Sequence, residues 1–277
     1  MNLPTDPTAI IGGPELASRF MPLITGGWKS FSAHGVICRV MSDFTIKVKA
    51  GSRLCLMGPN ACGKSTLINI LLGLECLDSG QLHFVANADD WAGAVLQDYR
   101  RQLLPWASVK TNLLLPLSRS HRFDITDDQL LAKSTDFLKC LGHSISLHQK
   151  VGTLSGGQQQ ALVLARSTAF SPRLWILDEG MSAIDLGRRS SASELLVSQC
   201  AGRTAIFISH DLDDSLRLGT HLVVLDGQMN IATELPIERD PHCDIATFLK
   251  SKEASDIRSR VLDALGRPSK NGPSVVK

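Results

Sequence analysis

Short apolar runs, separated by longer stretches with helical periodicity, set the pattern of this chain. The runs that predict buried strands lie at 53–57, 174–177, 204–208 and 221–225. Further strand candidates are the alternating segment 44–49 and the short runs 81–85 and 92–96. Near-continuous apolar runs are typical of parallel strands that are covered on both faces. The pattern therefore predicts an α/β fold with a mostly parallel sheet.

The ends and one internal block depart from this pattern. Residues 1–27 are rich in Pro and Gly and predict a loose N-terminal tail. We expect the main domain to cover 28–250, with a polar, helical block at about 100–156 that predicts an inserted helical subdomain. Residues 251–277 begin with apolar positions at helical spacing, which predicts a short helix and then a flexible tail.

Composition narrows the class of protein. A chain of 277 residues that is 43% hydrophobic and 20% charged can bury one sizeable core. The formal net charge of +2 gives no electrostatic case for nucleic acid as a partner. The seven cysteines contain no Cys-x-x-Cys pair, and no apolar run approaches the roughly 20 residues that span a bilayer. We therefore expect a soluble cytoplasmic protein without a signal peptide, for which another chain would span any membrane.

One glycine-rich stretch carries the clearest chemistry. It consists of Gly58, Pro59, Asn60, Ala61, Cys62, Gly63, Lys64, Ser65 and Thr66. Two glycines separated by four residues and followed at once by Lys and Ser fit a phosphate-binding loop, and a predicted strand and helix flank it as that motif requires. The alternative is a plain glycine turn that leads into a helix.

The loop geometry explains the residue types. Gly58 and Gly63 allow the backbone to curl, so that successive N–H groups at the helix N-terminus converge on one anion. Lys64 is expected to reach the outer phosphates, and the Ser65 hydroxyl suits Mg²⁺. The stretch therefore predicts binding of a nucleoside polyphosphate with magnesium.

A second glycine-rich segment precedes a helical run. It reads Leu154-Ser155-Gly156-Gly157-Gln158. Ser155 and Gln158 have the spacing of a capping box, which would imply nothing more than a helix start. A capping box does not explain two glycines in the first helical turn, where each costs about 1 kcal/mol relative to Ala. These glycines would let another backbone or a phosphate approach closely.

Two carboxylates follow the predicted strand at 174–177. Acidic residues there could merely cap the next helix. Together with the glycine loop, however, Asp178 is expected to hold Mg²⁺ through water while Glu179 polarises the attacking water. Adjacent side chains at a strand end diverge, so different roles are expected.

The order of these motifs resembles that of ABC transporter ATPase subunits. The matching segments are the glycine loop, Gln97, Leu154–Gln158, Leu177-Asp178-Glu179, Ser182-Ala183-Ile184-Asp185 and Ser209-His210, and they span about 30–230. The resemblance implies a P-loop, RecA-like core with an antiparallel β edge and an inserted helical subdomain. It also implies ATP and Mg²⁺ as cofactors and ATP hydrolysis as the activity.

The resemblance further implies roles for single residues. Two copies, or one copy and a paralogous ATPase, would face each other head to tail, with Ser155 binding the γ-phosphate held by the partner. Gln97 would touch Mg²⁺ and the attacking water and link to the membrane subunit. His210 would contact the γ-phosphate and orient Glu179, and Asp185 would bridge the dimer interface. The resemblance also implies that Lys64 is a catalytic residue, together with Glu179, His210 and Gln97.

Two departures from the family pattern stand out. Glu179 is followed by Gly180 where the family usually has Pro, which loosens the backbone beside the catalytic base. The aromatic residue that stacks on adenine is also not at its usual place. Either Phe31 or His34 could serve instead.

The segment after Gln97 is similar to that of importers for nitrate, sulfonate, taurine and related small anions. The similar positions are Leu103-Leu104-Pro105-Trp106, Val109, Asn112 and Leu115-Pro116-Leu117. This similarity implies integral permease partners and, indirectly, a solute-binding protein, with the ATPase peripheral on the cytoplasmic face of the inner membrane. The alternatives are a soluble ABC ATPase not coupled to transport and a binding-only switch, the latter suggested by Gly180 alone.

Overall fold

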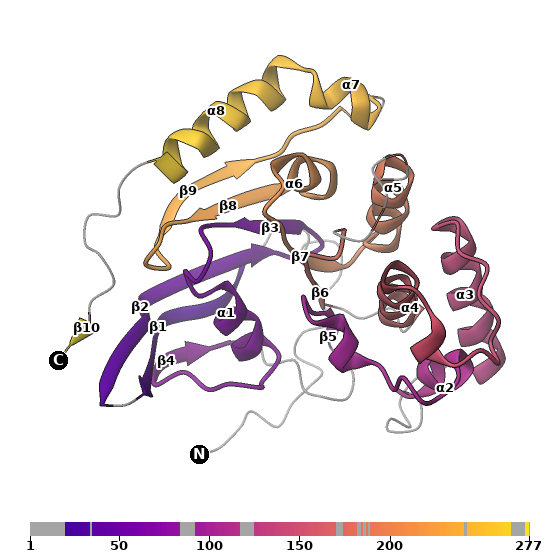
Figure 1. The fold of residues 1–277 in the computed structure, drawn as a ribbon. Coiled ribbons are helices and arrows are strands. Elements are labelled where there is room, and N and C mark those ends of the chain that lie inside the picture. Colours follow the sequence, from indigo (N-terminus) through magenta and orange to yellow (C-terminus); the bar gives the residue numbers. More distant parts are fainter. Residues whose placement is uncertain are drawn as a thin grey trace.

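The computed structural model places two sheets and a set of helices around two clusters of buried hydrophobic residues, one on each face of the larger sheet (Figure 1). It describes residues 20–33, 35–83, 92–116, 125–169, 174–181, 184, 187, 189–240, 243–266 and 275–276. The larger sheet has six strands in the order β5 (Ala92–Val95), β6 (Leu174–Asp178), β7 (Thr204–Ile208), β3 (Arg53–Met57), β8 (His221–Leu225) and β9 (Ile231–Pro236). All neighbouring pairs are parallel except β8 and β9. The predicted mostly parallel sheet and its buried strands are thus confirmed.

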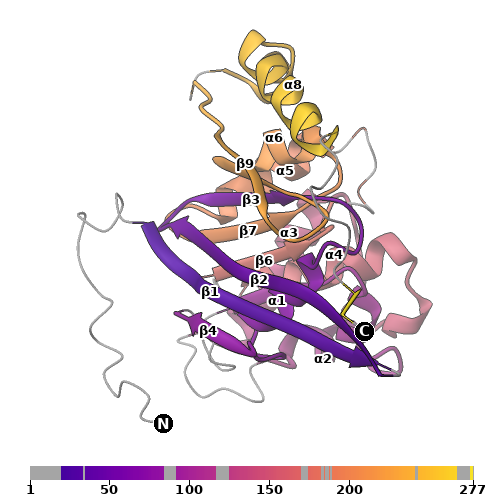
Figure 2. The same cartoon turned by 90° about the vertical axis from the view of Figure 1, so that its left-hand side faces the viewer.

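The smaller sheet is antiparallel and has the order β10 (Val275–Val276), β2 (Val36–Lys49), β1 (Phe20–Ala33) and β4 (Ser79–Leu82). Figure 2 shows β1 and β2 running side by side over the length of this sheet. The predicted antiparallel edge is confirmed, and β2 extends the predicted strand 44–49 toward the N-terminus. Of the candidate 81–85, residues 84 and 85 lie outside the described residues.

The predicted loose tail at 1–27 is wrong for its last eight residues. Residues 1–19 lie outside the described residues, but β1 begins at Phe20. Leu23 and Ile24 are 1% and 0% exposed, so this segment is held by core burial as well as by pairing with β2. Register shifts between Pro22 and Lys29 accommodate the Pro and Gly residues that suggested a loop.

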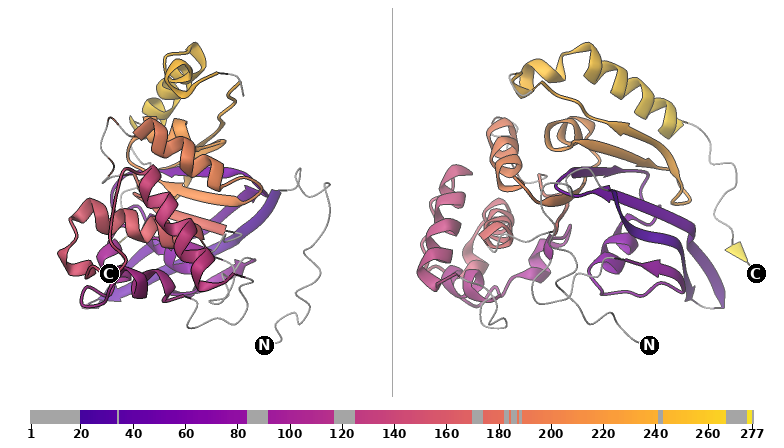
Figure 3. Two further views of the ribbon diagram at one scale, coloured as in Figure 1. Left: turned by 90° about the vertical axis from the view of Figure 1, so that its right-hand side faces the viewer. Right: turned by 180° about the vertical axis from the view of Figure 1, so that it is seen from behind.

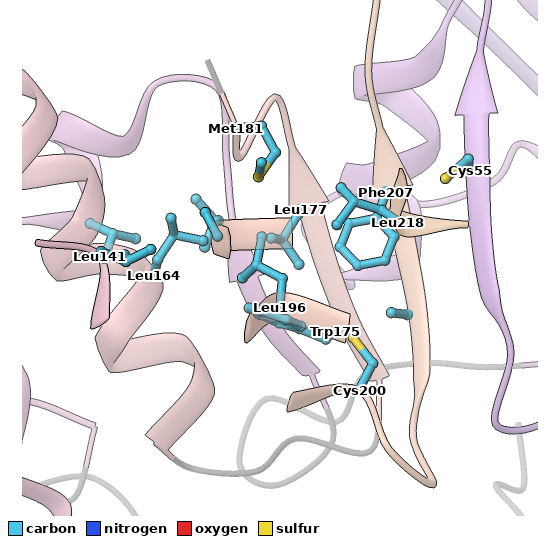
Figure 4. Close-up of a cluster of buried hydrophobic side chains, with 14 of the residues drawn as sticks. Cys55, Leu141, Leu164, Trp175, Leu177, Met181, Leu196, Cys200, Phe207 and Leu218 are labelled. Atoms are coloured by element: carbon cyan, nitrogen blue, oxygen red, sulfur yellow. The ribbon is translucent and has the colours of Figure 1, made fainter. Parts of the chain in front are cut away.

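The six-stranded sheet is covered on both faces. One face packs against α4 (Gly156–Ala169), α5 (Arg189–Gln199), α6 (Leu212–Leu218), α7 (Ile245–Leu249) and α8 (Lys252–Gly266). Figure 4 shows Trp175, Leu177 and Phe207 of the sheet among side chains from these helices. The alternate strand residues, such as Leu54, Ile176 and Ile206, face α1 (Lys64–Leu71) and the smaller sheet. Burial on both faces explains why these strands lack polar alternation.

The helical block stands beside the sheet. After the 3₁₀ turn Tyr99–Gln102 it contains α2 (Val109–Leu114), α3 (Asp127–Cys140) and the start of α4, which follows a second 3₁₀ turn at Val151–Thr153. Seen from behind in Figure 3, these helices lie on the opposite side of the molecule from β1 and β2. Its buried residues join the same core as the sheet, so the block is packed onto the domain.

The helix predicted after residue 250 is α8. It packs against β9 and β8 through Ala254, Ile257 and Val261, and Arg258 anchors it by an ion pair to Asp213 with an N–O distance of 2.7 Å. Leu262 is 66% exposed, so not all of the apolar positions that predicted this helix face the core. Among the described helices, none has both the length and the apolar character that crossing a membrane requires.

Candidate nucleotide site

Four adjacent parallel strands place the predicted motifs at one edge of the larger sheet. Gln97 follows β5, Glu179 follows β6, His210 follows β7 and the glycine loop follows β3. The carboxyl ends of parallel strands meet at one edge of a sheet, which is where ligands bind in such folds. The strand order β5-β6-β7-β3 therefore brings together residues that are far apart in the sequence.

The glycine loop is tightly packed at both of its glycines. A Cβ at Gly58 would lie 3.0 Å from the Cβ of Leu225 and 3.1 Å from its carbonyl oxygen. Gly63 has a φ of 117°, and a Cβ there would lie 2.8 Å from Cγ1 of Val40. A side chain at either position would therefore crowd Leu225 of β8 or Val40 of β2. Packing thus favours glycine at both positions, and at Gly63 the backbone conformation favours it as well.

Lys64 is held inside the loop. Its Nζ atom donates hydrogen bonds to the carbonyl oxygens of Gly58, at 2.8 Å, and Pro59, at 2.7 Å. The residue is only 7% exposed, and no acidic residue forms an ion pair with it within the described chain. A buried cation is stabilised by a compensating anion, and the loop amides favour a phosphate in that position.

An open pocket of about 640 Å³ lies in front of the loop. It is lined by Val40, Asn60, Ala61, Gly63, Lys64, Ser65, Thr66, Gln97, Asp178, Glu179 and His210. The volume lies within the range of about 300–1,000 Å³ that is usual for small-molecule sites. The structure thus brings the loop, Gln97, both carboxylates and His210 into one site.

Asp178 ends β6 and is buried. Burial raises the pKa of its carboxyl from 3.8 to about 6, and the neighbouring charge of Glu179 adds to the rise. Lys64, His210 and the backbone amide of Gln97 partly offset this effect on the pKa. A divalent cation nearby would stabilise the charged form of this carboxylate. Asp178, Ser65 and Gln97 all carry oxygen donors of the kind that Mg²⁺ prefers, so the residues that line this pocket fit magnesium.

Glu179 has an unusual backbone conformation. Its φ is 55°, in the left-handed region that costs an L-residue about 1–2 kcal/mol. Its N–H donates to the carbonyl of Ile208 at 2.9 Å, and its own carbonyl accepts from Nε2 of Gln160 at 3.2 Å. Such strain is concentrated at functional sites. The strained backbone turns the Glu179 side chain into the pocket that Asp178 also lines.

The Glu179 carboxylate contacts the residues that follow the two neighbouring strands. Nε2 of Gln97 donates to Oε2 at 3.2 Å, and Nε2 of His210 lies 3.0 Å from Oε1. The side chain of Glu179 is 23% exposed, so it is open to the pocket. A carboxylate fixed in this way can polarise a water molecule beside a bound phosphate.

The segment Leu154–Gln158 forms the predicted capping box. The Ser155 hydroxyl accepts from the Gln158 amide at 3.3 Å, and the Ser155 amide donates to the Gln158 side chain at 3.0 Å. A Cβ at Gly156 would lie 3.1 Å from the Tyr99 hydroxyl, so this glycine permits a close contact within the same chain. Among the described residues that line the pocket, none comes from this segment. One copy of the chain therefore does not join it to the pocket.

Some sequence predictions are not resolved by this geometry. Asp185 and His34 lie outside the described residues, and Phe31 is 41% exposed and is not one of the pocket residues.

Two residues that contact the site are not predicted by the sequence. Val40 reaches the pocket next to a register shift in the β1–β2 pair, and Gln160 reaches Glu179 from α4. Neither contact has a signal in the sequence, apart from the nearness of Gln160 to Gln158.

The fold and this pocket define the class of protein. A glycine loop between a buried strand and a helix, with a carboxylate pair at the end of another parallel strand of the same sheet, is the arrangement of a P-loop nucleoside triphosphatase. Comparison with known proteins narrows this class further. The family model described as ABC transporter matches residues 41–182.

Curated relatives agree with the family model. The chain is 31% identical over 238 residues to the aliphatic sulfonates import ATP-binding protein SsuB of Ralstonia nicotianae, covering 83% of this chain and 78% of that protein. It is 32% identical to the taurine import ATP-binding protein TauB of Pseudomonas aeruginosa over 76% of this chain and 80% of that protein. The nitrate import ATP-binding protein NrtC of Synechocystis sp. is 30% identical over 73% of this chain but 31% of its own length.

A solved structure supports the fold. The ATP-binding cassette MJ0796, in a dimeric post-hydrolysis state bound to ADP and Pi, has a TM-score of 0.70 at 23% identity, covering 79% of this chain and 100% of that chain. The chain belongs to the ABC transporter family, as an ATPase subunit. The resemblance seen in the sequence is thereby confirmed.

Proposed function

We propose that this chain powers an ABC importer for a small anion such as a sulfonate, taurine or nitrate by binding and hydrolysing ATP. The relatives named as import ATP-binding proteins support the transport role, because the match to the sulfonate and taurine proteins covers most of both chains. The catalytic part of the proposal rests on the position of Glu179. It lies between Gln97 and His210, in the pocket that the glycine loop also lines.

The glycine loop holds the triphosphate. The backbone N–H groups of the loop, to which Pro59 contributes none, surround the β-phosphate. When the nucleotide binds, Lys64 moves from its loop carbonyls toward the negatively charged outer phosphates. Ser65, Gln97 and Asp178 would hold Mg²⁺. When bound, this ion supplies charge neutralisation on the phosphate oxygens.

Glu179 is the general base in this proposal. Its carboxylate orients the attacking water and accepts a proton from it, while Gln97 and His210 keep the carboxylate directed into the pocket. His210 also contacts the γ-phosphate. General-base catalysis of this kind contributes about 10²–10⁴-fold to a rate.

The active form is a head-to-tail dimer. In a single chain the segment Leu154–Gln158 does not line the pocket, so a second copy or a paralogous ATPase supplies it. The Ser155 hydroxyl and the amides at the start of α4 then bind the γ-phosphate, as helix N-termini commonly bind anions. Asp185 bridges the two copies. The dimeric state of MJ0796 is consistent with this arrangement.

The permease contact lies near Gln97 and the helical block. Trp106, between the 3₁₀ turn and α2, is 72% exposed, and an exposed aromatic residue is typical of a contact surface. Through this contact the chain would associate peripherally with the cytoplasmic face of the inner membrane. A solute-binding protein would take part only through the permease.

Purification of the tagged chain from native membranes tests the transport role. Recovery of an integral permease in stoichiometric amounts supports import. Recovery of the ATPase without any membrane protein, or with ribosomes or DNA, would instead support a soluble ABC ATPase that is not coupled to transport. A Trp106→Ala variant should lose the permease while it hydrolyses ATP at the parent rate.

A further inference from the structure

Gln160 connects α4, the helix that begins within the segment Leu154–Gln158, to the backbone of the proposed catalytic residue Glu179 of the same chain. It lies in the second turn of α4 and is 3% exposed. Its Nε2 atom donates to the backbone carbonyl of Glu179 at 3.2 Å. None of the roles assigned above to the loop, the carboxylates or the capping box uses this contact.

The contact acts on a peptide that needs support. Glu179 has a φ of 55°, which L-residues adopt only when their surroundings impose it. The N–H of Glu179 is fixed by Ile208 of β7 at 2.9 Å. The following residue is Gly180, which has no side chain that could restrain the peptide. On the carbonyl side, the hydrogen bond from Gln160 restrains the peptide that joins Glu179 to Gly180.

Rotation of this peptide would redirect the side chain. The Glu179 carboxylate lies 3.2 Å from Gln97, at the long end of the usual hydrogen-bond range, and 3.0 Å from His210, so a small displacement would lengthen the Gln97 contact beyond that range. A misplacement of about 1 Å at a catalytic group can lower a rate by about 100-fold. The backbone restraint is thus connected directly to the geometry of the base.

We propose that Gln160 is a positioning residue, which holds the Glu179 peptide in its strained conformation and so directs the catalytic carboxylate at the attacking water. The proposal rests on the proposed function of Glu179 as the base. In this proposal α4 has two roles: its first residues bind phosphate, and Gln160 in its second turn affects the rate of hydrolysis.

Steady-state kinetics of the full-length Gln160→Met protein test the proposal. Met fills a similar volume but cannot donate a hydrogen bond, so kcat for ATP hydrolysis should fall about tenfold while KM for ATP stays unchanged. Gln160→Asn, which keeps the amide but shortens its reach, should lose a similar factor and provides a second variant if Met destabilises the fold. Thr168→Val is the matched control, because it removes a buried hydroxyl-to-carbonyl bond of 3.0 Å to Ala165 on the same helix. It should keep the parent kcat.

A double-mutant cycle separates positioning from a general loss of stability. His210→Ala removes a second group that orients the same carboxylate, so adding Gln160→Met to it should lower kcat by less than the product of the two single effects. Multiplicative effects, a parent kcat in Gln160→Met, or an equal loss in Thr168→Val would overturn the proposal. A parent protein that hydrolyses no ATP would instead overturn the proposed function itself.

Discussion

The Nε2 atom of His210 lies 3.0 Å from Oε1 of Glu179, although 31 positions separate the two residues in the sequence. The contact exists because β6 and β7 are parallel neighbours, so that the residues following them emerge side by side. Gln97 reaches the other carboxylate oxygen from the end of β5, on the opposite side of β6. The carboxylate is thus held from both neighbouring strands, which fixes its direction without burying it.

Replacement of Glu179 by Gln tests its role as the base. Gln is similar in size but is a far weaker proton acceptor, so we expect kcat for ATP hydrolysis to fall by about 10²–10⁴-fold. ATP binding should persist, because the glycine loop is unchanged. The variant should therefore accumulate as an ATP-bound dimer, which size-exclusion chromatography with Mg·ATP would detect.

The outcome for this variant is decisive in both directions. Hydrolysis at the parent rate would show that Glu179 is not the base. A variant that hydrolyses ATP slowly and binds it, yet stays monomeric, would support Glu179 as the base but contradict the proposed dimer.

The sequence predicted the catalytic edge because its residues directly follow strands that are easily recognised. The strands 53–57, 204–208 and 221–225 were placed correctly, since continuous apolar runs are what burial on both faces requires. The run 174–177 likewise predicted β6, and because β6 and β7 are parallel neighbours, Glu179 and His210 lie at the same edge. Strand ends therefore carried most of the information about the site.

The features that the sequence did not predict depend on contacts between distant segments. β1 contains Pro22, Gly26 and Gly27, which suggest a loop, and only its pairing with β2 and β4 makes it a strand. Val40 reaches the pocket through an irregularity in that pairing. The contact from Gln160 to Glu179 requires α4 to pack against the end of β6. Local patterns contain no information on such contacts.

Two buried lysines allow a controlled test of the glycine loop. Lys64 and Lys29 are each 7% exposed, but Lys64 faces the pocket whereas Lys29 forms an ion pair with Glu75 at 2.7 Å. Lys64→Ala should abolish measurable binding of a fluorescent ATP analogue, because the charge on the outer phosphates is no longer compensated. Lys29→Met should bind the analogue as the parent does. Equal loss of binding in both variants would attribute the effect to stability rather than to phosphate recognition.

The raised pKa of Asp178 predicts that this carboxylate destabilises the protein without ligands. Burial raises its pKa from 3.8 to about 6, so between these values the native state binds more protons than the unfolded state does. Stability therefore falls as the pH rises through this window, and the full cost remains at higher pH. Asp178→Asn removes the charge. In the absence of nucleotide and magnesium, it should melt at a higher temperature than the parent at about pH 8, and the difference should vanish near pH 4.

A matched control and an activity measurement complete this test. Asp263→Asn, at an exposed position of α8, should melt with the parent at both pH values. The stabilised Asp178→Asn protein should also lose ATP hydrolysis, because a neutral amide binds Mg²⁺ more weakly than a carboxylate does. Stability gained at the expense of activity is expected where a charge is kept buried for function. A melting difference that is the same at both pH values would show that the charge of Asp178 is not its cause.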